Sequence, residues 1–283
     1  MKTQWTVGLA AAWMLCIPLA LAAQEGDPYT LQLIDYVNGG LKAQWMDLRV
    51  EQVEALDMQQ ARASARLHPQ SYRWVTDDPR RSGDGSNLTY LIDGSRLIPT
   101  GATADVAATA AAIDRAMATW GGIPCKREVG LLKRPYTGED PTIFDAQLGF
   151  GGYGNWRAAD IVVGGWMPPA FFDAVVPAGG RTVLALSVTF IFVGVDGQPT
   201  DVDHDGNLDI AANEIFFNAG FTWSTAGTGM DVQTAALHEI GHSLGLGHLG
   251  PPPTAVMNPV YAGARLSLKS LDRLALCQLW DSR

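Results

Sequence analysis

The chain has 283 residues, of which 47% are hydrophobic and 17% are charged, and it contains 31 Gly and 16 Pro. This composition excludes a disordered tail protein, a collagen and a long coiled coil. Lys and Arg number 20 against 29 Asp and Glu, giving a formal net charge of −9. A nucleic-acid binder usually has a basic face, so this charge balance argues against nucleic acid as a partner.

The N-terminus has the pattern of a secretory signal. Lys2 precedes an apolar run from about Val7, and Ala20-Leu21-Ala22 is a small-x-small cleavage site. A transmembrane anchor is the alternative, but the run is short and no basic cluster follows it. Residues 1–22 are predicted to be a cleaved signal peptide. The mature protein is then expected to be a secreted monomer, periplasmic or extracellular, without a membrane segment.

Removal of the signal leaves two cysteines, Cys125 and Cys277. In an oxidising compartment, two cysteines far apart in sequence most simply pair with each other. The disulfide would connect the middle of the chain to its last predicted helix. Two buried free thiols are the alternative.

Residues 23–70 are predicted to form a helical N-terminal extension, which is either a short pro-segment or a stalk. No Gly or Pro occurs from Leu41 to Leu67. Leu41, Trp45 and Leu48 follow helical spacing, although the pattern decays after them.

Residues 71–283 form the main predicted domain. Strands are expected at 71–75, 87–92, 160–163 and 182–193, and helices at 103–120, 231–244 and 267–280. Asp231 is a plausible N-cap of the second helix. Strands and helices neither alternate strictly nor separate cleanly, which favours a mixed α+β domain.

The segment from His238 to His248 reads HExxHxxGxxH. On a helix, His238 and His242 project from the same face, so both imidazoles can bind one ion. A residue free to adopt positive φ, such as Gly245, can end the helix and let His248 approach from the side. Three His ligands leave a fourth position for water, which is the arrangement of a catalytic zinc site.

Zinc lowers the pKa of its bound water from about 15.7 towards 7 and polarises a substrate carbonyl. Glu239 is predicted to take the proton of the attacking water and to deliver it to the leaving amine. Two surface histidines with a coincidental third are the alternative. Five matching residues at the required spacing argue against that coincidence.

The segment resembles the metzincin metallopeptidases and, within them, the matrixins. Ala255 to Tyr261 match the Met-turn of that family. The methionine of this turn, Met257, lies nine residues after His248. By resemblance, Met257 forms the hydrophobic floor beneath the zinc ligands, and Pro259 and Tyr261 line the wall of the S1′ pocket. Asn258 stands where the family commonly has Tyr.

The resemblance extends over about residues 71–283. It rests on further segments in matrixin-like order, namely 87–90, 118–120, 159–161, 215–218, Trp223 and 268–272. It implies a metzincin domain with a twisted, mostly parallel five-stranded sheet and three helices. It also implies a cleft where an extended peptide pairs with an edge strand, for which Leu184–Thr189 is the candidate.

Two differences from the family change what is expected of the zinc sites. Residues 23–70 contain no Cys, so a pro-domain thiolate cannot cap the zinc. Outside the motif only His68 and His204 remain, too few for the family's structural zinc site, so one catalytic zinc is expected.

An acidic loop precedes the strand at 215–218 and reads DxDxDGxxD. Oxygen ligands at these positions, with Gly at the sixth, suit Ca²⁺. The candidate ligands are Asp201, Asp203, Asp205, Asn207 and Asp209. Ala212 stands where an EF-hand has its bidentate Glu, so Glu214 is a candidate to close the site if the backbone bulges. A solvated acidic turn is the alternative.

The sequence therefore predicts a secreted zinc endopeptidase that acts on polypeptides. Two other classes stay open, a non-catalytic secreted binding protein and an amidase acting on a non-protein substrate. A non-catalytic version would most simply lose Glu239 or a ligand, and none is lost.

Overall fold

The computed structural model describes residues 29–33, 44–52, 72–75, 78, 81, 87–97, 106–126, 129–155, 157–192, 199–226, 229–249 and 254–281, the first two ranges as backbone only. The predicted signal peptide, residues 1–22, lies outside these ranges. Among the described residues, no helix is both long and apolar enough to cross a membrane.

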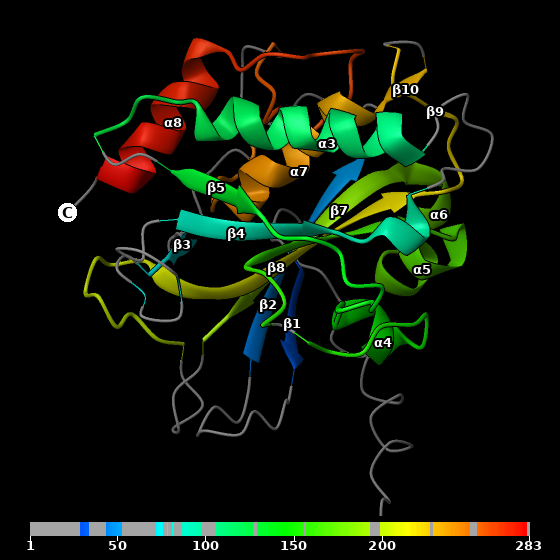
Figure 1. Cartoon of the computed structure of the whole chain (residues 1–283), viewed down its shortest axis with the longest axis horizontal. Helices are drawn as coiled ribbons and strands as arrows, with labels where there is room; N and C mark the ends of the chain where they lie inside the picture. Colours follow the sequence, from blue (N-terminus) through cyan, green and yellow to red (C-terminus); the bar gives the residue numbers. More distant parts are fainter. Residues whose placement is uncertain are drawn as a thin grey trace, which may run out of the picture.

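A mixed sheet forms the centre of the molecule (Figure 1). Its path runs β1-β2-β7-β8-β6-β4-β5, with β3 paired to β8. The strands are β1 (Tyr29–Leu33), β2 (Gln44–Gln52), β3 (Tyr72–Trp74), β4 (Asn87–Ile92), β5 (Gly130–Lys133), β6 (Ile161–Met167), β7 (Val183–Ile191) and β8 (Leu208–Asn218). A second, two-stranded sheet pairs β9 (Trp223–Ser224) with β10 (Met230–Asp231).

Three long helices and several short ones accompany the sheet. The long helices α3, α7 and α8 lie together on one side of it, at the top of Figure 1. The helices are η1 (Gly94–Arg96), α3 (Val106–Gly121), α4 (Phe144–Leu148), α5 (Pro169–Val175), α6 (Gly179–Thr182), α7 (Val232–Ser243) and α8 (Ser270–Asp281).

The predicted α+β metzincin fold is confirmed. Strands β8, β6, β4 and β5 pair in parallel, and β7 pairs with β8 in the antiparallel direction. These five strands correspond to the expected sheet. Among the described residues, β1, β2 and β3 extend this sheet to eight strands.

The N-terminal extension differs from its prediction. Gln44–Gln52 is a strand, so the helix predicted over this segment was wrong there. In Leu48-Arg49-Val50-Glu51, apolar and charged residues alternate with the period of a strand. Pairing with β7 then overrides a helix preference that is weak for each residue. Consequently Leu184–Thr189, predicted to lie at an edge, is covered by β2.

Two apolar layers fix the sheet between its helices. One layer packs α3, α7 and α8 against one face through side chains such as Trp120, Leu237 and Leu276. The other packs α4 and α5 against the opposite face, where Phe171 lies 5.0 Å from Phe216 between ring centroids. The histidine-bearing helix α7 is thus completely enclosed, with all its residues buried.

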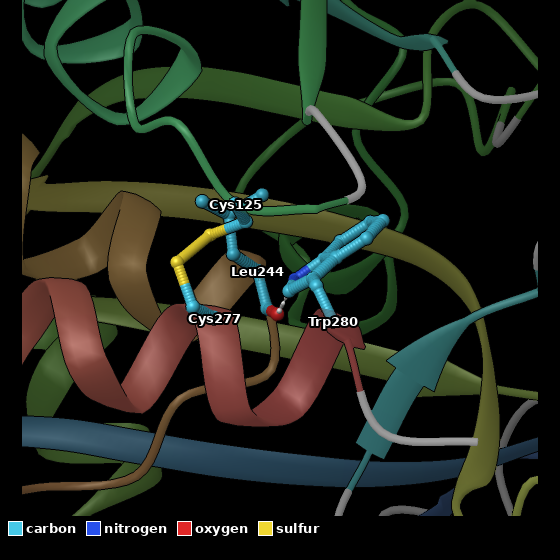
Figure 2. The surroundings of a disulfide bond; sticks show 4 residues. All are labelled: Cys125, Leu244, Cys277 and Trp280. Atoms are coloured by element: carbon cyan, nitrogen blue, oxygen red, sulfur yellow. Dashed lines mark hydrogen bonds between the residues drawn. A yellow bond between two sulfur atoms is a disulfide. The ribbon is translucent and has the colours of Figure 1, made fainter.

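A disulfide joins the start of the domain's middle segment to the last helix. Cys125 and Cys277 are bonded across 152 residues, with their Cα atoms 5.1 Å apart. Figure 2 shows this bond beside Trp280, whose indole Nε1–H donates to the Leu244 carbonyl at 3.3 Å. The disulfide therefore holds α8 where it contacts the end of α7.

Candidate metal centre and active site

Helix α7 begins and ends where the sequence predicts. The Asp231 carboxylate caps it by accepting from the Thr234 N–H at 2.8 Å and from the Thr234 hydroxyl at 2.7 Å. The helix ends at Ser243, and Gly245 follows with φ of 95°. A Cβ at position 245 would overlap the Tyr72 carbonyl, so only glycine permits this close turn.

The turn brings three imidazoles together. The Nε2 atom of His242 lies 3.0 Å from that of His238 and 3.3 Å from that of His248. The third side of the triangle, between His238 and His248, is 3.2 Å. His238 and His242 are buried and His248 is half-buried, so His248 is the most accessible of the three.

Backbone carbonyls orient two of the rings. The Nδ1 atom of His238 lies 2.7 Å from the Val256 carbonyl, and that of His242 lies 2.7 Å from the Leu246 carbonyl. A carbonyl can only accept, so each Nδ1 carries the proton and each Nε2 presents a lone pair. Converging lone pairs repel one another unless a cation lies between them.

This geometry fits a zinc ion. Two nitrogens bound at about 2.0–2.1 Å to one tetrahedral ion lie about 3.3 Å apart. The three observed separations, 3.0 to 3.3 Å, match that value closely. A group of three histidines with a half-open side suits a site that keeps one position for water.

Glu239 follows His238 on α7 and is 0% exposed. The main chain of the same residue is part of a polar network, because its carbonyl accepts from the Ser243 hydroxyl at 3.0 Å. The same hydroxyl lies 2.5 Å from the Oδ1 atom of Asn213 in β8, so its single proton is shared between these two acceptors. The network connects the helix that bears the histidines to the central sheet.

Met257 is fully buried beneath α7. A Cβ at Gly241 would overlap the Met257 sulfur and lie 3.0 Å from the Trp120 ring. Gly241 stands between His238 and His242 in sequence, so the missing side chain leaves room for Met257 directly under the histidine-bearing turn. The place of Met257 agrees with the floor that the resemblance implies.

Sequence reasoning missed one important acidic residue, Asp272. Its carboxylate is fully buried and accepts from the Val256 and Met257 N–H groups, both at 3.1 Å, and from the Lys269 N–H at 2.8 Å. Since Val256 also orients His238, Asp272 connects α8 to a histidine ring. Asp272 belongs to the matrixin-like segment 268–272, but an acidic residue in the first turn of a helix normally indicates only a favourable interaction with the helix dipole.

A small cavity lies beside the histidines. It is lined by Leu184 of β7, by His238 and by residues that include Asn258, Val260 and Tyr261. The Tyr261 hydroxyl accepts from the Asp231 N–H at 2.8 Å and donates to the Gly229 carbonyl at 3.1 Å, which fixes the ring. Pro259 is buried but is not among the described residues that line the cavity.

The acidic loop assembles only part of its predicted ligand set. Carboxylate oxygens of Asp201, Asp203 and Asp209 lie within 4.8 Å of one another. Burial raises the pKa of Asp209, and the charges of the two other carboxylates raise it further, against hydrogen bonds from Thr200 and Val202 that lower it. The two remaining loop ligands are engaged elsewhere: the Asp205 carboxylate pairs with Arg73 at 2.9 Å and accepts from the Asn207 amide at 2.9 Å.

Glu214 does not close the loop. It lies in β8, five residues after Asp209, and five strand residues span about 16 Å. Its two oxygens accept from the Ile143 N–H at 2.6 Å and the Phe144 N–H at 3.0 Å. Burial raises the pKa of Glu214 to about 8, although these two hydrogen bonds lower it.

Comparison with known proteins agrees with this geometry. Residues 191–281 match the family model described as Matrixin. Karilysin from Tannerella forsythia is 39% identical over 99 residues, which cover 30% of this chain and 19% of karilysin. The chain thus matches about a fifth of the length of this curated relative.

The helix with two histidines, the glycine turn to a third and the buried methionine beneath them define a metzincin-type domain. The segment that matches the Matrixin model, residues 191–281, contains all of these features. The chain contains a matrixin-like metzincin catalytic domain.

Proposed function

We propose that the protein is a secreted zinc-dependent endopeptidase that hydrolyses internal bonds of polypeptides. The observation that carries the proposal is the triangle of Nε2 atoms, 3.0 to 3.3 Å apart, next to the buried Glu239. The match of residues 191–281 to the Matrixin family model supports it. The disulfide and the N-terminal signal pattern support secretion.

Each residue has a distinct part in this mechanism. His238, His242 and His248 would hold the zinc ion, which would supply Lewis acidity and lower the pKa of a water molecule to about 7. Glu239 accepts the proton of the attacking water and returns it to the leaving amine. Its burial shields the transferred proton from bulk solvent. Met257 and Gly241 keep the histidine-bearing turn in place from below.

The cavity beside His238 is the proposed S1′ pocket, which receives the side chain after the cleaved bond. Tyr261 forms its wall. Its hydroxyl both accepts one hydrogen bond and donates another, and these two bonds fix the ring. Leu184 contributes from β7, so a polypeptide extended along that strand would place a side chain here. Pro259, which the resemblance also places in this wall, is buried.

The test is cleavage of an unstructured protein such as casein by the purified chain, with and without a zinc chelator. The control is Glu239→Gln, which removes the base but leaves the three histidines and hence zinc binding. Chelator-sensitive cleavage that is lost in the control supports the proposal. Binding of one zinc without any cleavage of proteins or peptides contradicts it and favours a binding role.

For the acidic loop we propose a reduced calcium site made of Asp201, Asp203 and Asp209. The support is their mutual distance and the raised pKa of Asp209, because a bound cation would relieve the cost of burying this charge. Calcium is expected to raise the melting temperature of the protein but not that of Asp203→Asn. An equal rise in both proteins would contradict the site.

A further inference from the structure

A second cavity lies on the face of the sheet opposite the histidines. Its volume is about 440 Å³, within the range of pockets that bind small molecules. Its lining includes Arg81, Arg134 and Arg157, together with Thr89, Asp160 and Ala211. Leu88 and Tyr90, the neighbours of Thr89 in β4, pack in the apolar layer of α3 and α7, so the Thr89 side chain points to the other face. The cavity is therefore separate from the metal centre.

Arg81 is a fixed positive charge in the wall of this cavity. Its side chain is buried, its Nε atom lies 3.2 Å from an Asp160 oxygen, and its Nη1–H donates to the Val75 carbonyl at 2.8 Å. The Asp78 carboxylate lies 3.8 Å from Nη2, and the guanidinium carbon lies 5.2 Å from the centre of the Trp74 ring. These contacts hold the guanidinium in one orientation, so a ligand need not order it on binding.

The two other arginines are exposed and come from opposite ends of the connection between β5 and β6. Arg134 directly follows β5, and its backbone N–H donates to the Tyr90 carbonyl at 2.7 Å. Its Nη1–H donates to the Ala158 carbonyl at 3.2 Å, which uses one of the five N–H donors of a guanidinium. Arg157 lies shortly before β6. Guanidinium groups from three separate segments thus meet at one cavity.

The cavity is locally basic in an acidic chain. Among its described lining residues, three arginines against the one carboxylate of Asp160 leave a net charge of +2, whereas the whole chain carries −9. Both Asp160 oxygens are engaged by the protein, one by Arg81 and the other by the Thr89 N–H and hydroxyl, both at 2.7 Å. If Asp78, which contacts Arg81, is also counted, the net charge is still +1. The cavity therefore suits an anion.

We propose that this cavity binds a small organic ester of phosphate or sulfate, with Arg81, Arg134 and Arg157 around its oxyanion. A tetrahedral oxyanion directs three outer oxygens to different sides, which suits guanidinium groups from three segments. A carboxylate has only two oxygens, both in one plane. The volume is many times the roughly 30 Å³ that a water molecule occupies, so it has room for an organic part beside the oxyanion. The site is independent of the endopeptidase function proposed above.

The test is calorimetric titration of the full, zinc-loaded chain in a Glu239→Ala background, where self-cleavage cannot interfere. The probes are phenyl phosphate, phenyl sulfate and benzoate, which share one ring and differ in the anionic group. The test variant is Arg134→Gln/Arg157→Gln, because both side chains are exposed and the fold is expected to tolerate the change. The matched control is Arg181→Gln/Arg273→Gln, which removes the same charge from two exposed positions on α6 and α8.

The expected result is one saturable site for at least one ester, with affinity at least tenfold weaker in the test variant and unchanged in the control. A tenfold loss corresponds to about 1.4 kcal/mol, less than one hydrogen bond to a charged group commonly contributes. The ester that binds more tightly identifies the preferred oxyanion, and benzoate should bind at least tenfold more weakly than that ester.

Four outcomes would overturn the proposal. The first is that neither ester binds saturably, and the second is that the test variant binds as well as its parent. The third is an equal loss in test variant and control, which would show a general effect of charge. The fourth is benzoate binding as tightly as both esters, which would refute the ligand class. Binding that survives in the test variant but is lost with a zinc chelator would place the anion at the histidines, as one form of the second outcome.

Discussion

Replacing Asp272 by Asn should weaken both the fold and the metal site, because one buried carboxylate serves both. Its oxygens accept three backbone N–H groups, two from the Met-turn and one from Lys269 at the start of α8. An amide keeps one oxygen and presents an NH₂ group to at least one of these donors. Losing a charge-assisted hydrogen bond and leaving a buried N–H unsatisfied costs about 2–4 kcal/mol in free energy of unfolding.

The effect on zinc follows from the contact between Val256 and His238. The Val256 N–H is held by Asp272, and the carbonyl of the same residue orients the His238 ring at 2.7 Å. Loss of such a supporting partner typically weakens metal binding by about 10–100-fold. Glu239 and the other two ligands are unchanged, so the variant should still bind one zinc.

Two measurements separate these effects. Urea unfolding in excess chelator gives the stability of the metal-free protein, and competition with a chromophoric chelator gives the zinc affinity. The matched control is Glu139→Gln, the same chemical change at an exposed position. If Asp272→Asn lowers the stability but leaves the zinc affinity at the wild-type value, the proposed coupling through Val256 is wrong.

Three further predictions concern other buried groups of the domain. The pKa of Glu214 is raised to about 8, so the folded state keeps a proton that the unfolded state releases near 4.5, and stability falls as the pH rises between these values. Relative to Glu214→Gln, wild type should lose about 1.4 kcal/mol per pH unit from pH 5 to 7 in urea unfolding, and a constant difference would contradict the shift. Gly241→Ala should lower the free energy of unfolding by about 1–3 kcal/mol and weaken zinc binding, because the methyl group overlaps Met257. Gly121→Ala is the control and should leave both quantities unchanged, because a methyl group fits at that position. Cys125→Ser/Cys277→Ser should lower the unfolding free energy by about 4–5 kcal/mol, as expected for a closed loop spanning 152 residues, and calorimetry showing no loss would exclude a stabilising disulfide.

The sequence predicted those parts of the site that depend on local spacing. Helix α7, its Asp231 cap and the positive φ at Gly245 follow from residues within one short segment, and the structure confirms all three. The disulfide could be predicted because only two cysteines remained after the signal. In each case the local sequence left few alternative structures to choose from.

The parts that were missed depend on contacts between distant segments. The partners of Asp272 lie up to 16 residues before it, on the other side of a turn, so no local pattern shows that it holds the Met-turn. Glu214 has the composition of a calcium ligand, but its strand carries it into the core against Ile143 and Phe144, 70 or more residues away. An ionisable residue near an acidic loop in sequence is therefore weak evidence for a shared site.

The N-terminal extension shows why the error about β2 matters for function. Helix preferences of ordinary residues differ by at most about 0.7 kcal/mol each, so a free β7 edge that pairs with a whole strand can decide the conformation. The same edge would attract any extended polypeptide, which is the property an endopeptidase of this kind needs.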